Sequence, residues 1–318
     1  MHLHLNPSGH VFHDGERQMH ARLGVSARMQ ELGLRVIRDH MPDQHRTFFE
    51  MLRIVHLGMV DENGHPWAVT RIGDRGFMLS QDKRSLTIAS RPLAGEPAGL
   101  DTRPGAKISV LGLEMETRRR NRLNATIRAS GGDALQLSVD QSYGNCPKYI
   151  QTRVALDDAA PALPQVTVTP ALTDRDRALI RKADILMLAS RAPELGDDPR
   201  AGVDINHRGG MPGFVEVPDA ETLIFPDYRG NNFYNSLGNI LLDARVGLQF
   251  FDFETGTTLN ITGMAEVVET PPTEPAAQLP LMGRSVRVRI GRVTRASGAL
   301  PLRYALAEYS PNNPALSV

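Results

Sequence analysis

The sequence has little cysteine, few aromatic residues and no excess of charge of either sign. Its 318 residues include one cysteine, Cys146, which excludes an intramolecular disulfide and fits a reducing compartment. Lys and Arg together number 36, as do Asp and Glu, so the positive charge typical of a nucleic-acid-binding protein is missing. No stretch approaches the roughly 20 apolar residues of a membrane helix, and the first residues contain no apolar secretory segment. We therefore expect a cytoplasmic protein that contacts neither nucleic acid nor membrane.

Short apolar strands separated by Gly, Pro and Asp make up most of the chain beyond residue 45. In the segment 53–73, two such strands flank Glu62-Asn63-Gly64, and Asn-Gly between apolar runs is a strong hairpin signal. The number and length of these strands predict a mainly β fold built as a barrel or sandwich. The chain ahead of them has a helical pattern, so we expect peripheral helices at the N-terminus.

Matching spacings in the two halves indicate an internal repeat. Gly76-Phe77 is followed nine residues later by Leu86, and Gly213-Phe214 is followed nine residues later by Leu223. Continuing the match places Val110 opposite Leu248. We predict two copies of one β module.

The predicted organisation has four parts. An N-terminal helical extension covers 1–44, the first β module covers 45–154, a Pro- and Ala-rich linker covers 155–172, and the second β module covers 173–318. Thr173 and Asp176 have the spacing of a capping box, which predicts a helix at the start of the second module.

The stretch "FPDYRGNNFYNSLGNI", 225–240, is the most informative part of the second module. A β-like run from Thr222 stops at Pro226, and a helical pattern begins at about Asn232. A strand, a polar turn and a helix start form a place where proteins bind anions. Asn231 and Asn232 either cap the helix, as Asn often does, or contact a ligand.

Several segments together resemble a known family. "GVDINHRGGMPGFVEV", "TLIFPDYRGNNFYNSLGNI" and "GLQFFDFETGTTLNITGMAEV" are similar to the pyridoxamine 5'-phosphate oxidase-like FMN-binding split barrels, and "TRRRNRLN" and "SYGNCPKYIQTR" resemble a subgroup with two tandem modules. The resemblance implies two six-stranded antiparallel Greek-key split barrels and an FMN cofactor. It also implies that the turn after residue 225 holds the FMN phosphate, with Asn231 and Asn232 where oxidases commonly have an Arg-Lys pair.

The candidate cofactor-binding residues come from three segments. The segment "NHRGG" is either a turn between strands or a source of phosphate donors, and "TRRRNR" is either a solvated hairpin tip or a site for an anion or a partner subunit. No cluster has convincing metal-site spacing, and the sequence identifies no catalytic residue. The predicted cofactor-binding residues are His207, Arg208, Arg229, Asn231, Asn232, Asn235, Arg118 and Arg120.

We therefore expect an FMN-dependent oxidoreductase that acts on an unidentified small molecule, in a chain that can form a homodimer. Flavin would carry the electron chemistry, and the protein would supply orientation and electrostatics. The alternatives are a non-catalytic flavin-binding or carrier protein and, by analogy of fold alone, a haem-handling split barrel.

Overall fold

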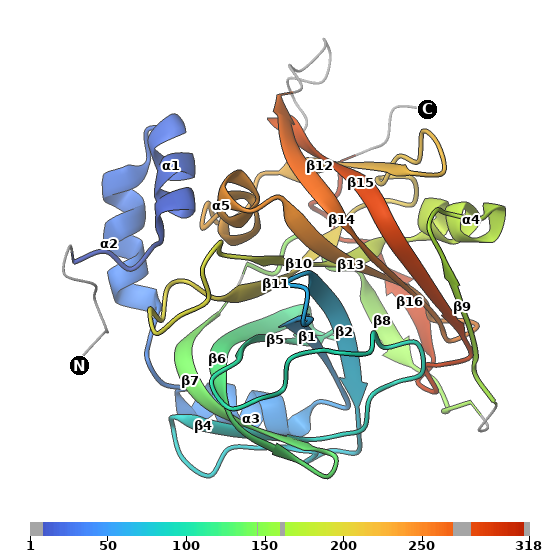
Figure 1. The fold of residues 1–318 in the computed structure, drawn as a ribbon, viewed down its shortest axis with the longest axis horizontal. Coiled ribbons are helices and arrows are strands. Elements are labelled where there is room, and N and C mark those ends of the chain that lie inside the picture. The colour runs from blue at the N-terminus through green and yellow to red at the C-terminus, as the bar shows by residue number, and fades with distance from the viewer. Residues whose placement is uncertain (1–8, 145, 160–162, 270–280, 315–318) are drawn as a thin grey trace.

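The computed structural model describes residues 9–144, 146–159, 163–269 and 281–314 (Figure 1). Antiparallel strands dominate these residues, and the helices lie at the periphery of the sheets, which confirms the predicted mainly β fold class. The helices are α1 (Asp14–Arg22), α2 (Ser26–Val36), α3 (Asp43–Met51), α4 (Asp174–Lys182) and α5 (Asn235–Leu242).

The first sheet has the strand order β2-β1-β5-β6-β7-β4-β3. All of its neighbouring strands are antiparallel. We call the strands of this sheet the first module. They are β1 (Ile54–Val60), β2 (Pro66–Ile72), β3 (Met78–Leu79), β4 (Ser85–Ala89), β5 (Lys107–Glu114), β6 (Arg119–Gly131) and β7 (Ala134–Gly144).

The second sheet has the order β11-β10-β13-β14-β15-β12, and β9 pairs with β15 outside this path. We call its strands, together with α5, the second module. Strands β8 and β16 form a separate two-stranded sheet. The strands are β8 (Thr152–Ala155), β9 (Gln165–Thr169), β10 (Ile185–Arg191), β11 (Val203–Gly209), β12 (Thr222–Tyr228), β13 (Arg245–Asp252), β14 (Thr257–Glu269), β15 (Leu281–Ser297) and β16 (Tyr304–Glu308).

The two sheets have the same strand order and the same register. Strands β1, β2, β5, β6, β7 and β4 of the first correspond in order to β10, β11, β13, β14, β15 and β12 of the second. Val110 lies opposite Leu57 and Leu123. Leu248 occupies the equivalent place, opposite Leu188 and Ile261. The register also shifts at equivalent points of the two longest hairpins, after residue 124 in one and after residue 262 in the other.

Each module has its own hydrophobic core, and a further core lies between the two modules. Val110 lies in a core inside the first module, and Leu248 lies in a core inside the second. A third core contains residues of both, including Leu111, Met187 and Ile205. Strands β1 and β10 are buried along their whole length, because one face lies in a module's own core and the other packs between the modules.

Local sequence signals succeeded at some element boundaries and failed at others. The hairpin at residues 62–64 joins β1 to β2, and the capping box of Thr173 and Asp176 opens α4, as predicted. Strand β12, however, runs through Pro226 to Tyr228. It is the last strand on its sheet path, and an edge strand tolerates a residue without an N–H donor.

The segment predicted as a linker contains more structure than expected. Residues 165–169 form β9, which pairs with β15 from Val293 to Ser297. The strand has the short alternating pattern Gln-Val-Thr-Val-Thr, but its side chains are mostly exposed, so it has no buried apolar face and lies within a Pro- and Ala-rich stretch that suggested a linker.

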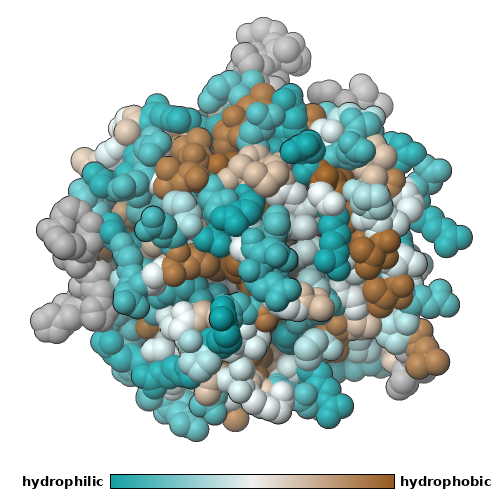
Figure 2. All heavy atoms as spheres, viewed as in Figure 1, coloured by the Kyte–Doolittle hydropathy of each residue, from teal (hydrophilic) through white to brown (hydrophobic). Residues whose placement is uncertain are grey.

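The surface is predominantly hydrophilic on the face drawn in Figure 2, with small, scattered hydrophobic patches. Among the described residues, none of the helices combines the length and the apolar character needed to cross a bilayer.

Candidate ligand pocket between the modules

A pocket opens where the second module meets the first. It contains about 770 Å³ of space, counting the solvent at its mouth. Strand β6 and the segment after β7 line it from the first half of the chain, and β11, the end of β12 and the start of α5 line it from the second. The lining residues are Arg120, Cys146, Lys148, Tyr149, Asn206, His207, Arg208, Gly209, Phe214, Pro226, Asp227, Tyr228, Gly230, Asn231, Asn232, Tyr234, Asn235 and Ser236.

The turn between β12 and α5 has an unusual backbone. Asn232 and Tyr234 both adopt left-handed conformations, with φ of 62° and 60°. Asn tolerates this region, whereas it is uncommon for a bulky residue such as Tyr. Residues held in such conformations cluster at ligand sites, where the surrounding structure enforces them.

Helix α5 begins at Asn235, three residues later than the sequence predicted, and no side chain caps its first turn. The side-chain oxygen of Asn231 accepts a hydrogen bond from the Phe233 N–H at 3.2 Å, and that of Asn232 accepts one from the Tyr234 hydroxyl at 3.1 Å. Neither Asn is therefore the helix cap. Their amide nitrogens have no partner among the described residues and remain available as donors at the pocket.

Strand β11 contributes a histidine and an arginine with unsatisfied nitrogens. The Nε of Arg208 is buried without a hydrogen-bond partner in the described part of the chain. Its Nη1 lies 3.5 Å from Asp227, a loose ion pair. His207 is also buried, and its Nε2 has no partner there either. Burial, reinforced by nearby arginines, lowers the pKa of His207 well below its usual value, so its ring is neutral at pH 7.

Arg120 reaches the same pocket from β6 of the first module. Its Nε is another buried nitrogen that no described residue satisfies. Burial, together with the charge of neighbouring Arg122, lowers the pKa of Arg120 to about 9, so the residue stays charged at neutral pH. A bound anion would relieve both the desolvation and the repulsion between these arginines.

The charges around the pocket favour an anionic ligand. Arg120, Lys148 and Arg208 line it, and Asp227 is the one acid among the lining residues. Asp227 already forms an ion pair with Arg284 at 2.9 Å.

Two of the predicted cofactor-binding residues do not line the pocket. The Nε of Arg118 donates to the Ile150 carbonyl at 3.0 Å, and its Nη2 lies 3.3 Å from Glu308. Arg229 contributes its backbone carbonyl, which accepts a hydrogen bond from the Tyr149 hydroxyl at 2.9 Å. The other six predicted residues, His207, Arg208, Asn231, Asn232, Asn235 and Arg120, all line the pocket.

Sequence reasoning missed the residue that joins the pocket walls. Arg122 is fully buried and forms an ion pair with Asp204 at 2.8 Å. It also donates to the Asn235 side-chain oxygen at 3.1 Å and to Asn206. Asn206 in turn donates to the Ser236 hydroxyl at 2.6 Å. An arginine of the first module thus fixes the start of α5 against β11.

A signal for Arg122 was present in the sequence. Leu123, Ala125 and Ile127 belong to the core of the first module. Strand alternation therefore places Arg120 and Arg122 on the other face of β6, which packs toward the second module. The sequence shows the alternation, but it does not show that another module covers this face.

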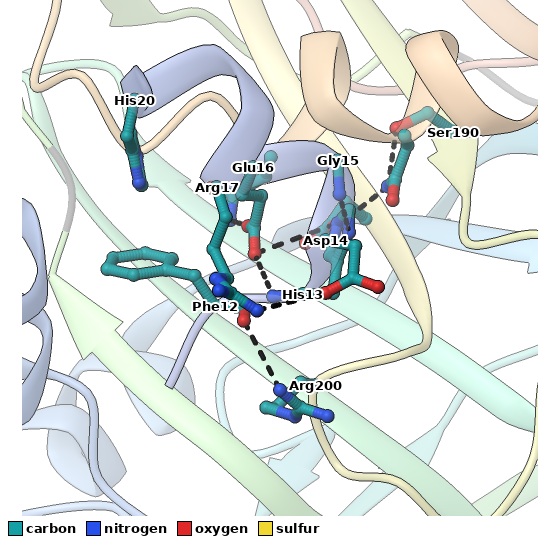
Figure 3. Close-up of polar contacts among 12 residues, drawn as sticks. Phe12, His13, Asp14, Gly15, Glu16, Arg17, His20, Ser190 and Arg200 are labelled. Atoms are coloured by element: carbon teal, nitrogen blue, oxygen red, sulfur yellow. Dashed lines mark hydrogen bonds and ion pairs between the residues drawn. The ribbon is translucent and has the colours of Figure 1, made fainter. Parts of the chain in front are cut away.

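The N-terminal helix contacts the ligand turn and the start of α5, and Figure 3 shows the polar contacts at the beginning of α1. His13 and Glu16 form a capping box at the start of α1. The Glu16 carboxylate also accepts a hydrogen bond from the Asn235 side chain. The Nε2 of His20 lies 2.9 Å from the Asn232 carbonyl oxygen.

Helices α1 and α5 touch at a pair of glycines. A Cβ added at Gly15 would lie 2.0 Å from the Gly238 carbonyl oxygen, so only glycine fits there. This close contact buries Glu16, and burial raises the pKa of its carboxyl to about 7. The N-terminal extension is therefore part of the pocket's support.

The described residues contain no group of three or more His, Cys, Asp or Glu side chains arranged to hold a metal ion.

Fold and pocket define the chain as an antiparallel β protein with a cationic pocket at a strand–turn–helix junction.

Residues 172–299, which include this junction, match the family described as "Pyridoxamine 5'-phosphate oxidase". This match covers less than half of the chain, and over these residues the chain is similar to the pyridoxamine 5'-phosphate oxidase family.

Similar solved structures are smaller proteins. HupZ from Group A Streptococcus is 14% identical, with 44% of this chain and 98% of that chain covered and a TM-score of 0.28. A pyridoxamine 5'-phosphate oxidase-like protein from Lactobacillus delbrueckii is 19% identical, with 39% and 94% covered and a TM-score of 0.29. The FAD binding protein from Mycobacterium smegmatis is 16% identical, with 42% and 98% covered and a TM-score of 0.26. Among curated proteins, none matches this sequence.

Proposed function

We propose that the chain is an FMN-dependent oxidoreductase and that the pocket between its two modules binds the cofactor. The observation that carries this proposal is a set of three buried, unsatisfied nitrogens on one pocket: Nε of Arg120, Nε of Arg208 and Nε2 of His207. Buried polar groups are nearly always satisfied, so a cluster of exceptions indicates a missing partner.

A phosphate monoester fits this arrangement. Arginine N–H groups are strong phosphate donors, and the uncapped N-terminus of α5 favours negative charge. The free amide nitrogens of Asn231 and Asn232 supply neutral donors on the turn beside it. The family match over 172–299, together with the cofactor that the sequence resemblance implies, makes FMN the phosphate ester to test first.

The chain's own residues would bind and orient the cofactor. Arg120 and Arg208 would balance the phosphate charge from opposite modules. Tyr149 and Tyr228 line the other part of the pocket, with ring centroids 5.0 Å apart. Burial raises the pKa of Tyr149 to about 12, so its hydroxyl stays protonated at neutral pH. Bound FMN would supply the electron transfer, and a small molecule entering the pocket mouth would be the substrate.

The test begins with the purified protein. Denaturation followed by mass analysis should release FMN, and the visible spectrum should show two flavin bands. A Soret band instead would favour a haem-handling protein. Steady-state reduction of the bound flavin by a nicotinamide cofactor, with turnover, would separate an enzyme from a flavin carrier.

Matched arginine variants test the site itself. Arg208→Gln and Arg120→Gln should each weaken FMN binding by about 10-fold or more, since a hydrogen bond to a charged group is worth about 1.5–3 kcal/mol. Arg118→Gln is the control, because Arg118 comes from the same basic run but does not line the pocket. Equal effects of all three substitutions would contradict the assignment.

A further inference from the structure

The first module contains a counterpart of the arginine that serves the pocket. Arg71 of β2 pairs with Val55, the second residue of β1. Arg208 of β11 pairs with Leu186, the second residue of β10. Because the two sheets share one strand order and register, Arg71 and Arg208 occupy equivalent positions.

The partners of these two arginines differ. Arg208 has an unsatisfied Nε and a loose contact with Asp227. Arg71 forms a buried ion pair with Glu96, and its Nη2 donates to Glu96 Oε1 at 2.7 Å. The Arg71 and Glu96 side chains are only 5% and 8% exposed. Glu96 thus gives Arg71 a closer carboxylate partner than Asp227 gives Arg208.

Glu96 belongs to the connection that replaces the helix of the ligand site. Between β12 and β13 the second module has the ligand turn and α5, whereas residues 90–106, between β4 and β5, contain no helix. This connection packs tightly: Gly95 has a φ of +78°, and a Cβ there would lie 2.5 Å from the Ala296 Cβ.

The residues that reach from one module to the other at equivalent strand positions also differ. Asn260 pairs with Gln249 on β13, just as Arg122 pairs with Leu111 on β5, so the two residues are equivalent. Arg122 reaches across to the ligand-site module. Asn260 instead donates to the Gly95 carbonyl at 3.1 Å and holds the connection in place.

We propose that Glu96 is an internal anion that occupies the first-module counterpart of the ligand site, so that one chain binds a single FMN. The identity of the ligand rests on the proposed function. The occupancy of the counterpart rests on Arg71, Gly95, Glu96 and Asn260 alone. A second phosphate would have to displace a buried carboxylate that already neutralises its arginine.

Cofactor stoichiometry tests this inference. Equilibrium dialysis of the full, flavin-free chain against FMN should give one equivalent per chain. The double variant Arg71→Gln/Glu96→Gln, which carries neither charge, should also bind one equivalent with the wild-type affinity, whereas Arg208→Gln should bind FMN about 10-fold more weakly or worse. Two equivalents in the wild type would overturn the proposal. So would weaker FMN binding by the double variant Arg71→Gln/Glu96→Gln combined with unchanged binding by Arg208→Gln.

A flavin-free measurement separates this inference from the proposed function. Glu96→Gln leaves Arg71 unpaired, so inorganic phosphate should raise the thermal midpoint of this variant by several degrees more than that of the wild type, relative to sodium chloride of equal ionic strength. The double variant Arg71→Gln/Glu96→Gln should lose this additional phosphate-dependent rise in the thermal midpoint. The control is Glu62→Gln, because Glu62 is exposed beside the same connection, where its N–H bonds the Gly99 carbonyl. A phosphate response of Glu96→Gln no larger than that of Glu62→Gln would show that Glu96 does not occupy an anion site. If the wild type binds no FMN, the proposed function fails while this measurement still decides the role of Glu96.

Discussion

Substituting Asn232 by Asp changes one donor at the ligand turn and almost nothing else. The Asn232 side-chain oxygen accepts from the Tyr234 hydroxyl at 3.1 Å, and Asp can keep that bond. The backbone φ of 62° is one that both Asn and Asp tolerate. The free amide nitrogen, in contrast, becomes a second carboxylate oxygen facing the pocket.

The effect on cofactor affinity has two parts. Losing a hydrogen bond to a charged phosphate costs about 1.5–3 kcal/mol, or about 10- to 150-fold in the dissociation constant. The new carboxylate adds repulsion from the phosphate, because the reduced dielectric near a pocket screens it less than bulk water. Asn232→Gly removes the donor without adding charge, and glycine accepts the positive φ. Asp should therefore weaken FMN binding more than Gly does.

The assay combines FMN titration, followed by flavin fluorescence, with thermal unfolding of the flavin-free variants. We expect Asn232→Asp to unfold at nearly the wild-type temperature while its FMN affinity falls by at least 10-fold. Asn63→Asp, at the exposed hairpin turn, is the control and should leave both quantities unchanged. Wild-type FMN affinity in Asn232→Asp, or weaker binding by Asn232→Gly than by Asn232→Asp, would refute the assignment of Asn232 to the phosphate.

Three further predictions concern stability and are tested by urea unfolding. The pKa of Glu16 is raised from 4.5 to about 7 in the folded state, so between these pH values the native state holds a proton that the unfolded state has lost. The contribution of Glu16 to the free energy of unfolding therefore falls as the pH rises from 4.5 to 7, by up to about 3 kcal/mol. Glu16→Gln should remove this part of the pH dependence, and identical pH slopes in variant and wild type would contradict it. Arg122→Met leaves the buried Asp204 without its arginine and should cost about 3–5 kcal/mol. Arg118→Met removes an ion pair with the exposed Glu308 and should cost at most about 1 kcal/mol; equal losses would show that the cross-module ion pair is unimportant. Leu248→Ala should cost about 2–5 kcal/mol through a cavity in the second core, and a loss below 1 kcal/mol would mean that the core is loosely packed.

The sequence alone indicated the features that depend on neighbouring residues. Asn63-Gly64 predicted the hairpin between β1 and β2, because that turn needs a positive φ, which Gly64 adopts. Thr173 and Asp176 predicted the start of α4, because both halves of a capping box lie within one turn. Matched spacings placed Val110 opposite Leu248, and the strand register puts both residues at equivalent places.

The sequence also located much of the pocket. Six of its eight predicted cofactor-binding residues line the pocket. They lie in two short segments of the second module and at one position of the basic run. Arg118 and Arg120 are only two residues apart, yet Arg118 lies ahead of β6 with a φ of 61°, where the regular alternation of a strand does not apply.

Only the tertiary structure decided which polar side chains are paired and which are left without partners. Arg71 and Arg208 occupy equivalent strand positions. Glu96, contributed by a loop 25 residues further along the chain, pairs closely with the first, while the Nε of the second has no described partner at the pocket. Glu16 reaches Asn235 from 219 residues away. Caps and turns satisfy backbone groups within a few residues, so sequence reveals them. The pairing of a buried charge depends instead on which distant segment packs over it, and that is fixed only when both modules and the N-terminal helix assemble.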